Sequence, residues 1–284
     1  MKIILARHAG FCFGVKRATQ MAFEKASEEG GGRTCTLGPI IHSPQVVARL
    51  EAKGVKVIKS LAEIDDGRII LRSHGVTAAE MKAAYDKGLV VVDATCPFVK
   101  KAQKQVKMLS DEGYDMVIVG EKEHPEVEGI ISYASGKVFV VASVDDALKL
   151  PEMKKTGIVA QTTQSYHTLE AVADVCLAKT QELRVFNTIC DATSVRQDEA
   201  KVIAGDVGCM LVIGGFNSAN TRRLAEVCSE IQKNTHHVET VEQLSPEWFV
   251  GVESVGVTAG ASTPKWLIDE VLAGINALCP DKKG

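Results

Sequence analysis

The stretch Val90-Val-Val-Asp-Ala-Thr-Cys96-Pro97-Phe98 places a cysteine between two elements of secondary structure. Its β-branched run is typical of a buried strand, and Pro97 is typical of the first turn of a helix, which we expect to extend to Leu109. Cys96 therefore lies at a predicted strand-to-helix turn. Because parallel α/β sheets bind ligands at the carboxyl ends of their strands, this turn is a candidate site.

The same arrangement occurs at two other cysteines. A strand predicted over residues 3–6 leads to Cys12, and a strand predicted over residues 183–188 leads to Cys190; a helical pattern follows each cysteine. The three cysteines recur at intervals of roughly 90 residues, which indicates an internal repeat. We therefore predict an α/β fold of three similar small parallel-sheet βαβ units in a pseudo-threefold arrangement. The expected ranges are 1–13 for the N-terminal strand and first cysteine, 14–96, 97–192, and 193–284 with the C-terminal segment.

The other strand-to-helix turns of the repeats carry polar side chains. One set has His42, His124 and the run Asn217-Ser-Ala-Asn220, and another has His74, the Thr162-Thr163 pair and Ser262. If the units face one another with these ends inward, one cavity receives three thiolates and a ring of neutral hydrogen-bond donors. Helix N-termini in the same place favour an anion.

Composition excludes several classes of protein. A chain of 284 residues with 45% hydrophobic residues can bury a substantial core, and a net charge of −3 argues against non-specific binding to nucleic acid. No apolar run reaches the roughly 18 residues that a membrane span needs, and no signal-peptide core follows Met1, so we expect a cytoplasmic protein with no membrane partner. Eight cysteines without a C-x-x-C pair point to ligands gathered from distant parts of the chain.

Three thiolates allow more than one chemistry. Zinc could be held by three cysteines and a histidine. An iron–sulfur cubane on three cysteines instead leaves one iron open, and that iron can act as a Lewis acid while the cluster supplies electrons. The anion-binding features favour redox chemistry on a phosphate ester. Two rival functions are a zinc-dependent hydrolase or lyase acting on a phosphorylated metabolite and a non-catalytic iron–sulfur sensor.

Six motifs in unbroken order, from Met1 to about Leu278, resemble those of the 4-hydroxy-3-methylbut-2-enyl diphosphate reductases, the last enzymes of the non-mevalonate isoprenoid pathway. The motifs are Gly10-Phe-Cys-Phe-Gly-Val15, Ser73-His-Gly-Val76, Asp93-Ala-Thr-Cys-Pro97, His124-Pro-Glu-Val-Glu-Gly129, Gln161-Thr-Thr163 and Thr258-Ala-Gly-Ala-Ser262. One departure is Ala219, where many relatives have a second serine.

The resemblance implies a 4Fe-4S enzyme, with one cluster per chain at the centre of the three units. It removes the C4 hydroxyl of the substrate by two-electron reduction at the open iron, which binds that hydroxyl, and it yields isopentenyl and dimethylallyl diphosphate. Ferredoxin or flavodoxin would donate the electrons. The implied cluster ligands are Cys12, Cys96 and Cys190. The implied diphosphate-binding residues are His42, His74, Ser218, Asn220 and Ser262, with His124 between them and the substrate chain, Glu126 as proton donor and Thr162 orienting the hydroxyl.

Some expectations rest on the residues alone. A carboxyl in a cavity away from water should have a raised pKa, which would let Glu126 hold a proton near neutrality. The remaining cysteines and histidines have structural interpretations: Cys35, Cys176, Cys209, Cys228 and Cys279 as core residues, and His167, His236 and His237 as structural or exposed side chains. No role is assigned to His8. The lysines after Cys96 form either a solvated helix face or a docking surface for an acidic electron donor: Lys100, Lys101, Lys104 and Lys107.

Overall fold

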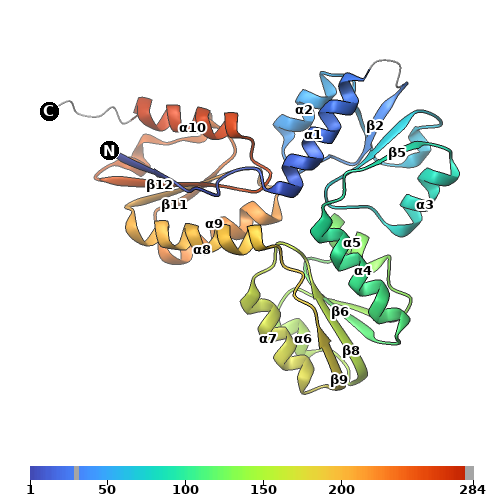
Figure 1. Ribbon diagram of the computed structural model, residues 1–284. Coiled ribbons are helices and arrows are strands. Elements are labelled where there is room, and N and C mark those ends of the chain that lie inside the picture. The colour runs from blue at the N-terminus through green and yellow to red at the C-terminus, as the bar shows by residue number, and fades with distance from the viewer. Residues whose placement is uncertain (29–31, 279–284) are drawn as a thin grey trace. The chain divides into compact units, whose positions relative to one another are not determined.

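A computed structural model describes residues 1–28 and 32–278 of the chain, which form two compact units. The terminal unit consists of Met1–Lys16, His42–Ala48 and the chain from Asp191 onward, and the central unit consists of Arg17–Ile41 and Arg49–Cys190. Cys279 lies outside the described residues. The terminal unit contains one four-stranded sheet and the central unit contains two (Figure 1).

All strand pairs in the three sheets are parallel. The sheet of the terminal unit has the order β11 (Thr235–Val238), β10 (Cys209–Ile213), β12 (Ser254–Ala259), β1 (Lys2–Leu5). The first sheet of the central unit has the order β3 (Lys56–Ile58), β2 (Thr34–Leu37), β4 (Arg68–Leu71), β5 (Val90–Asp93). Its second sheet has the order β7 (Val138–Val141), β6 (Asp115–Val119), β8 (Met153–Ala160), β9 (Thr180–Val185).

The three sheets share one topology, which confirms the predicted repeat of parallel α/β units. In each central sheet the first strand along the chain has the second on one side and the third on the other, and the fourth strand lies at the edge. The terminal sheet has the same order, with the N-terminal strand β1 in the fourth position. The fourth strands β1, β5 and β9 are the ones that lead to Cys12, Cys96 and Cys190. The proposed ranges 1–13, 14–96, 97–192 and 193–284 stay a prediction.

Helices alternate with these strands. They are α1 (Phe13–Ser27), α2 (Pro44–Glu51), α3 (Ala78–Asp86), α4 (Pro97–Asp111), α5 (Pro125–Ile131), α6 (Val144–Leu148), α7 (Tyr166–Leu177), α8 (Asp191–Asp206), α9 (Ala219–Ile231) and α10 (Lys265–Leu278), with short 3-10 turns at Leu61–Glu63, Val241–Gln243 and Pro246–Phe249. No described helix is long and apolar enough to cross a membrane, and the cytoplasmic location stays a prediction.

Strand β10 illustrates why its sheet is apolar on both faces. Leu211 and Ile213 pack in one buried cluster with side chains of α10, whereas Met210 and Val212 pack in another with side chains of α8 and α9. Figure 1 shows α10 on one side of this sheet and α8 and α9 on the other. A strand covered on both faces is a continuous apolar run rather than an alternation of apolar and polar residues, as Cys209–Ile213 is.

Two strands end or shift for local reasons. Strand β2 stops at Leu37, although the strand-like sequence continues to residue 41, because Gly38 has φ +70°, outside the extended region. The strand predicted over residues 183–188 lies at Thr180–Val185 instead. Thr188 is therefore not part of the strand, and its hydroxyl oxygen accepts a hydrogen bond from the N–H of Ala160 at 2.8 Å.

Candidate active site

The best-defined part of the predicted site is a buried carboxyl of the central unit. Glu126 lies in the first turn of α5 and is 2% exposed. Its Oε1 accepts the backbone N–H of Thr162 at 2.6 Å, and its Oε2 lies 2.8 Å from the Thr162 hydroxyl. Burial raises the pKa of Glu126 to about 7, although both hydrogen bonds from Thr162 act to lower it. The raised pKa expected from the sequence is confirmed.

The two histidines of the central unit lie next to this carboxyl. His124 is the N-cap of α5, and its Nδ1 accepts the backbone N–H of Glu126 at 3.1 Å. Because Nδ1 is an acceptor, the neutral imidazole carries its proton on Nε2. The His74 and His124 rings meet edge to face, with centroids 5.6 Å apart. The sequence predicted both residues at matched turns, and the fold brings them together.

Backbone hydrogen bonds join these side chains to two of the predicted cysteines. The N–H of Cys190 donates to the carbonyl of Thr162 at 3.0 Å, and the N–H of Cys96 donates to the carbonyl of Ser73 at 2.9 Å. Ser73 precedes His74 in the chain. A continuous series of contacts therefore runs from Cys190 through Thr162, Glu126, His124 and His74 to Cys96.

The terminal unit holds the other predicted residues. Ser218 is the N-cap of α9, where its Oγ accepts the N–H of Thr221, and the Ser262 hydroxyl donates to Ser218 Oγ at 3.4 Å. Asn220 follows in the first turn, 7% exposed, and its Nδ2 has no hydrogen-bond partner within the described part of the chain. A buried amide without a partner is costly, so this donor is suited to a ligand oxygen.

Cys12 and His42 belong to the same unit. The N–H of Cys12 donates to the carbonyl of Ala261 at 3.2 Å, one residue before Ser262. The backbone of His42 approaches the β10–α9 loop, because a Cβ on Gly215 would lie 3.0 Å from the His42 carbonyl oxygen. Glycine therefore permits this close approach.

The seven described cysteines fall into two groups. Cys12, Cys96 and Cys190 are half-buried at the ends of strand-to-helix connections, whereas the other four are buried in the core, as predicted: Cys35, Cys176, Cys209 and Cys228. Burial raises the pKa of Cys209 and of Cys228 to about 12, so these two remain thiols. Among the described cysteines, the three predicted ligands are the ones that are not buried in the core.

The described residues contain no group of three or more histidine, cysteine, aspartate or glutamate side chains that could hold a metal ion. Cys12 lies in the terminal unit, whereas Cys96 and Cys190 lie in the central unit. The three-cysteine ligand set therefore stays a prediction.

The sequence motif Gln161-Thr-Thr163 includes Gln161, but no role was predicted for this side chain, which supports the Thr162 turn. Its side chain is fully buried, with Oε1 accepting the Glu121 N–H at 3.0 Å and Nε2 donating to the Thr163 hydroxyl at 3.1 Å. Gln161 thus ties the loop after β8 to the loop that leads to His124. The signal was present, since a glutamine that directly follows a buried strand needs polar partners.

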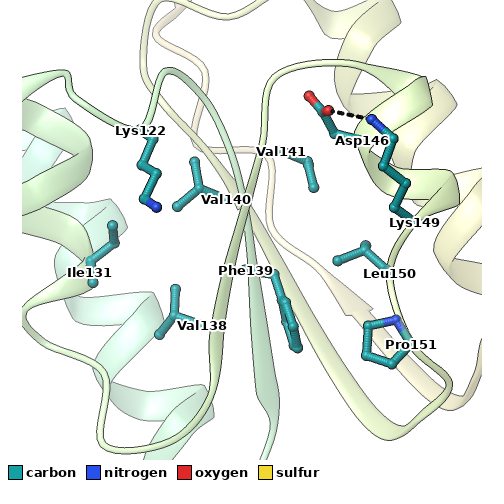
Figure 2. Close-up of a pocket in the computed structure, with 10 residues that line it drawn as sticks. All are labelled: Lys122, Ile131, Val138, Phe139, Val140, Val141, Asp146, Lys149, Leu150 and Pro151. Carbon is teal, nitrogen blue, oxygen red and sulfur yellow. Dashed lines mark hydrogen bonds and ion pairs between the residues drawn. The ribbon is translucent and has the colours of Figure 1, made fainter.

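A pocket of about 530 Å³ follows the edge strand β7 and does not belong to this site. Its walls are mostly aliphatic, with Phe139 and Pro151 on one side of the strand and Ile131 on the other (Figure 2). Asp146 and Lys149 form an ion pair at its rim.

Three other histidines have the structural or exposed positions that the sequence predicted. His236 stacks on Trp248, His237 forms a hydrogen bond with the Gly214 carbonyl, and His167 is exposed.

Comparison with known proteins gives the family of this chain. The model of the LytB protein family matches residues 3–276. The chain is 65% identical to the 4-hydroxy-3-methylbut-2-enyl diphosphate reductase of Geotalea uraniireducens, covering 99% of each chain. It is also 65% identical to the enzyme of that name from Geobacter sulfurreducens, covering 100% of both.

Two solved structures are similar over nearly the whole chain. One is (E)-4-hydroxy-3-methyl-but-2-enyl diphosphate reductase, the terminal enzyme of the non-mevalonate pathway, with 47% identity, TM-score 0.71, and coverage of 98% of this chain and 100% of that chain. The other is the E-1-hydroxy-2-methyl-but-2-enyl-4-diphosphate reductase from Plasmodium falciparum, with 28% identity, TM-score 0.90, and coverage of 99% and 89%. The chain therefore belongs to the LytB protein family and is an enzyme of the oxidoreductase class.

Proposed function

We propose that this chain reduces (E)-4-hydroxy-3-methylbut-2-enyl diphosphate to isopentenyl diphosphate and dimethylallyl diphosphate. The bond between C4 and its hydroxyl oxygen breaks, the oxygen leaves as water, and two electrons and two protons balance the reaction. The observation that carries the proposal is the buried Glu126–Thr162 pair beside the Cys190 turn. A carboxyl with a pKa of about 7 can deliver a proton at neutral pH.

The proposed cofactor is one 4Fe-4S cluster held by Cys12, Cys96 and Cys190. The half-buried positions of these three thiols support the assignment, because cluster ligation needs thiolates that are within reach of the incoming iron. When bound, the cluster supplies the electrons and a Lewis-acidic iron.

The proton path follows from the hydrogen bonds of Glu126. Oε1 accepts a backbone N–H, which cannot accept a proton in return, so the acid proton of Glu126 resides on Oε2. Oε2 faces the Thr162 hydroxyl, which can accept this proton while donating its own. We therefore assign Thr162 to orienting the C4 hydroxyl and passing it a proton that comes from Glu126.

The diphosphate is assigned to the neutral donors that the sequence predicted. Ser218, Asn220 and Ser262 lie at the starts of helices or in the turns before them, where free N–H groups favour anionic oxygens. His42 and His74 complete the set, with His124 between the diphosphate and the substrate chain. Ala219 lacks a hydroxyl but keeps its backbone N–H at the first position of α9.

The electron donor is proposed to be ferredoxin or flavodoxin, which docks on the lysines of α4. This helix begins directly after Cys96. Lys100 and Lys107 pair with Asp93 and Asp111, whereas Lys101 and Lys104 are exposed and make no hydrogen bond or ion pair within the described residues. Their positive charge is therefore available to an acidic partner.

A charge-reversal experiment separates docking from a merely solvated face. The variant Lys101→Glu/Lys104→Glu should slow reduction by ferredoxin or flavodoxin and leave reduction by dithionite unchanged. The matched control Lys53→Glu/Lys154→Glu changes the net charge equally at exposed lysines of other elements. Equal rates for the two variants with the protein donors would contradict the docking assignment.

The proposed activity is tested with anaerobically reconstituted protein and substrate, with products identified by mass spectrometry. We expect both five-carbon diphosphates to form only when a reductant is present. Cys96→Ser should lose the cluster and the activity, whereas Cys209→Ala should keep both, because Cys209 is a core residue. Turnover that needs no reductant would overturn the proposal and favour the zinc-dependent hydrolase or lyase.

A further inference from the structure

The loop that precedes Cys12 is held by a single carboxylate from α8. Glu199 Oε1 accepts the backbone N–H of Arg7 at 2.8 Å, and Oε2 accepts the backbone N–H of His8 at 3.0 Å. The His8 ring adds a third contact, with Nδ1 2.9 Å from Oε2. Hydrogen bonds to a charged acceptor are among the stronger ones in proteins, so this carboxylate fixes the conformation of the loop.

A buried arginine one turn earlier on α8 holds the same loop from another side. Arg196 is 3% exposed, and its Nη1 donates to the carbonyl of His8 and to the carbonyl of Ala259 at 3.0 Å. A buried guanidinium is stable only when such acceptors are in place. The position of the His8 carbonyl is therefore closely coupled to that of Ala259.

Ala259 connects this arrangement to the diphosphate site. It ends β12 and precedes the turn in which the Ala261 carbonyl accepts the N–H of Cys12 and Ser262 donates to Ser218. Arg196 thus bonds both the loop that presents Cys12 and the turn that presents Ser262. Glu199 contacts the Cys12 loop but makes no hydrogen bond to this turn within the described residues.

We propose that Arg196 and Glu199 are positioning residues that hold Cys12 in its ligating conformation, and that Arg196 also sets the position of Ser262. Helix α8 begins at Asp191, directly after Cys190, so one helix starts at one cysteine and holds the loop of another. The proposal rests on the proposed function, because it takes Cys12 as a cluster ligand. It also gives a role to His8, which accepts the Arg196 bond and faces Glu199.

Two series of variants distinguish the two residues. Glu199→Ala removes all three contacts, whereas Glu199→Gln keeps one oxygen that can still accept one N–H. Arg196→Met removes both carbonyl contacts, and Arg196→Lys keeps a cation that can reach one of them. Asp198→Ala is the matched control, since Asp198 lies on the same helix, is exposed and, within the described residues, makes one ion pair, with Lys201 at 3.9 Å.

The first readout is the rate at which iodoacetamide alkylates Cys12 in the apoprotein, mapped by mass spectrometry relative to Cys96. The second is the rate at which the holoprotein releases iron to a chelator. We expect Glu199→Ala and Arg196→Met to raise both rates about ten-fold, with the conservative variants in between, as the loss of hydrogen bonds to a charged group implies. Asp198→Ala should match the wild type, and circular dichroism confirms that each variant is folded.

The third readout is the Michaelis constant for the substrate. Arg196→Met should raise it because Ser262 moves, whereas Glu199→Ala should leave it within about two-fold of the wild type. Alkylation and iron-release rates equal to those of the wild type in Glu199→Ala and Arg196→Met would overturn the proposal. A wild-type protein that binds no iron would instead refute the proposed function. In that case, the alkylation rates of the apoprotein would still test whether Arg196 and Glu199 fix the position of Cys12.

Discussion

Replacing Glu126 with glutamine tests the proton donor through stability as well as turnover. Burial raises the pKa of Glu126 from 4.5 to about 7 in the folded protein. The folded state therefore binds this proton more tightly than the unfolded state does. Its contribution to stability is fully present below pH 4.5 and is lost as pH rises towards 7, with a total of about 3 kcal/mol.

The assay is urea unfolding of the apoprotein at about pH 5 and about pH 8, for the wild type and for Glu126→Gln. Glutamine does not titrate, and it can keep both contacts with Thr162. Groups that titrate in both proteins cancel in the comparison. We expect the wild type to lose about 2.5 kcal/mol relative to the variant between the two pH values.

Turnover gives the second half of the test. Without the acid proton, Glu126→Gln should keep its cluster but lose turnover by a factor of about 100 or more, as removal of a general acid implies. The wild type should also lose activity as pH rises above about 7, where Glu126 ionises. Near-normal turnover of the variant, or a stability difference that does not change with pH, would refute the reasoning.

Three further predictions concern residues around the site. Asn220→Leu should leave the free protein as stable as the wild type, because a buried amide without a partner is removed, but it should raise the Michaelis constant; a stability loss in thermal unfolding would contradict this. Thr162→Val should lower turnover and raise the pH at which activity is lost, because the Thr162 hydroxyl lowers the pKa of Glu126. Thr162→Ser should return the turnover and this pH to their wild-type values. Gln161→Leu should destabilise the protein by about 1–3 kcal/mol in urea unfolding, since the acceptor of the Glu121 N–H is lost; an unchanged midpoint would show that Gln161 is dispensable.

The sequence predicted most of the fold because its signals are local. Pro97 after a β-branched run marked the start of α4, and the recurrence of this pattern at Cys12 and Cys190 predicted three equivalent sheets. It did not predict that β1 takes the fourth position in a sheet otherwise made of residues 209–259, because strand pairing between distant segments leaves no local pattern. The end of β2 at Gly38 depends on one φ angle that periodicity does not record.

The site was predictable where a side chain lies at a strand-to-helix turn. His124 and Thr162 could be named in this way, whereas Glu126 was implied by the family resemblance. The structure places Glu126 in contact with both. Arg196 and Glu199 could not, because they lie within a helix and act on a loop 188 to 192 residues away in the chain. Only the fold shows that the carboxylate of Glu199 meets the N–H groups of Arg7 and His8.

The central claim is that Cys12, Cys96 and Cys190 hold a 4Fe-4S cluster that acts on the diphosphate substrate. Its most direct test is a Mössbauer spectrum of anaerobically prepared, iron-57-labelled protein, with and without (E)-4-hydroxy-3-methylbut-2-enyl diphosphate. We predict that one of the four irons has a distinct signal, because it lacks a cysteine ligand, and that this signal shifts when substrate is added. Absence of iron, or four equivalent irons that are indifferent to substrate, would contradict the account.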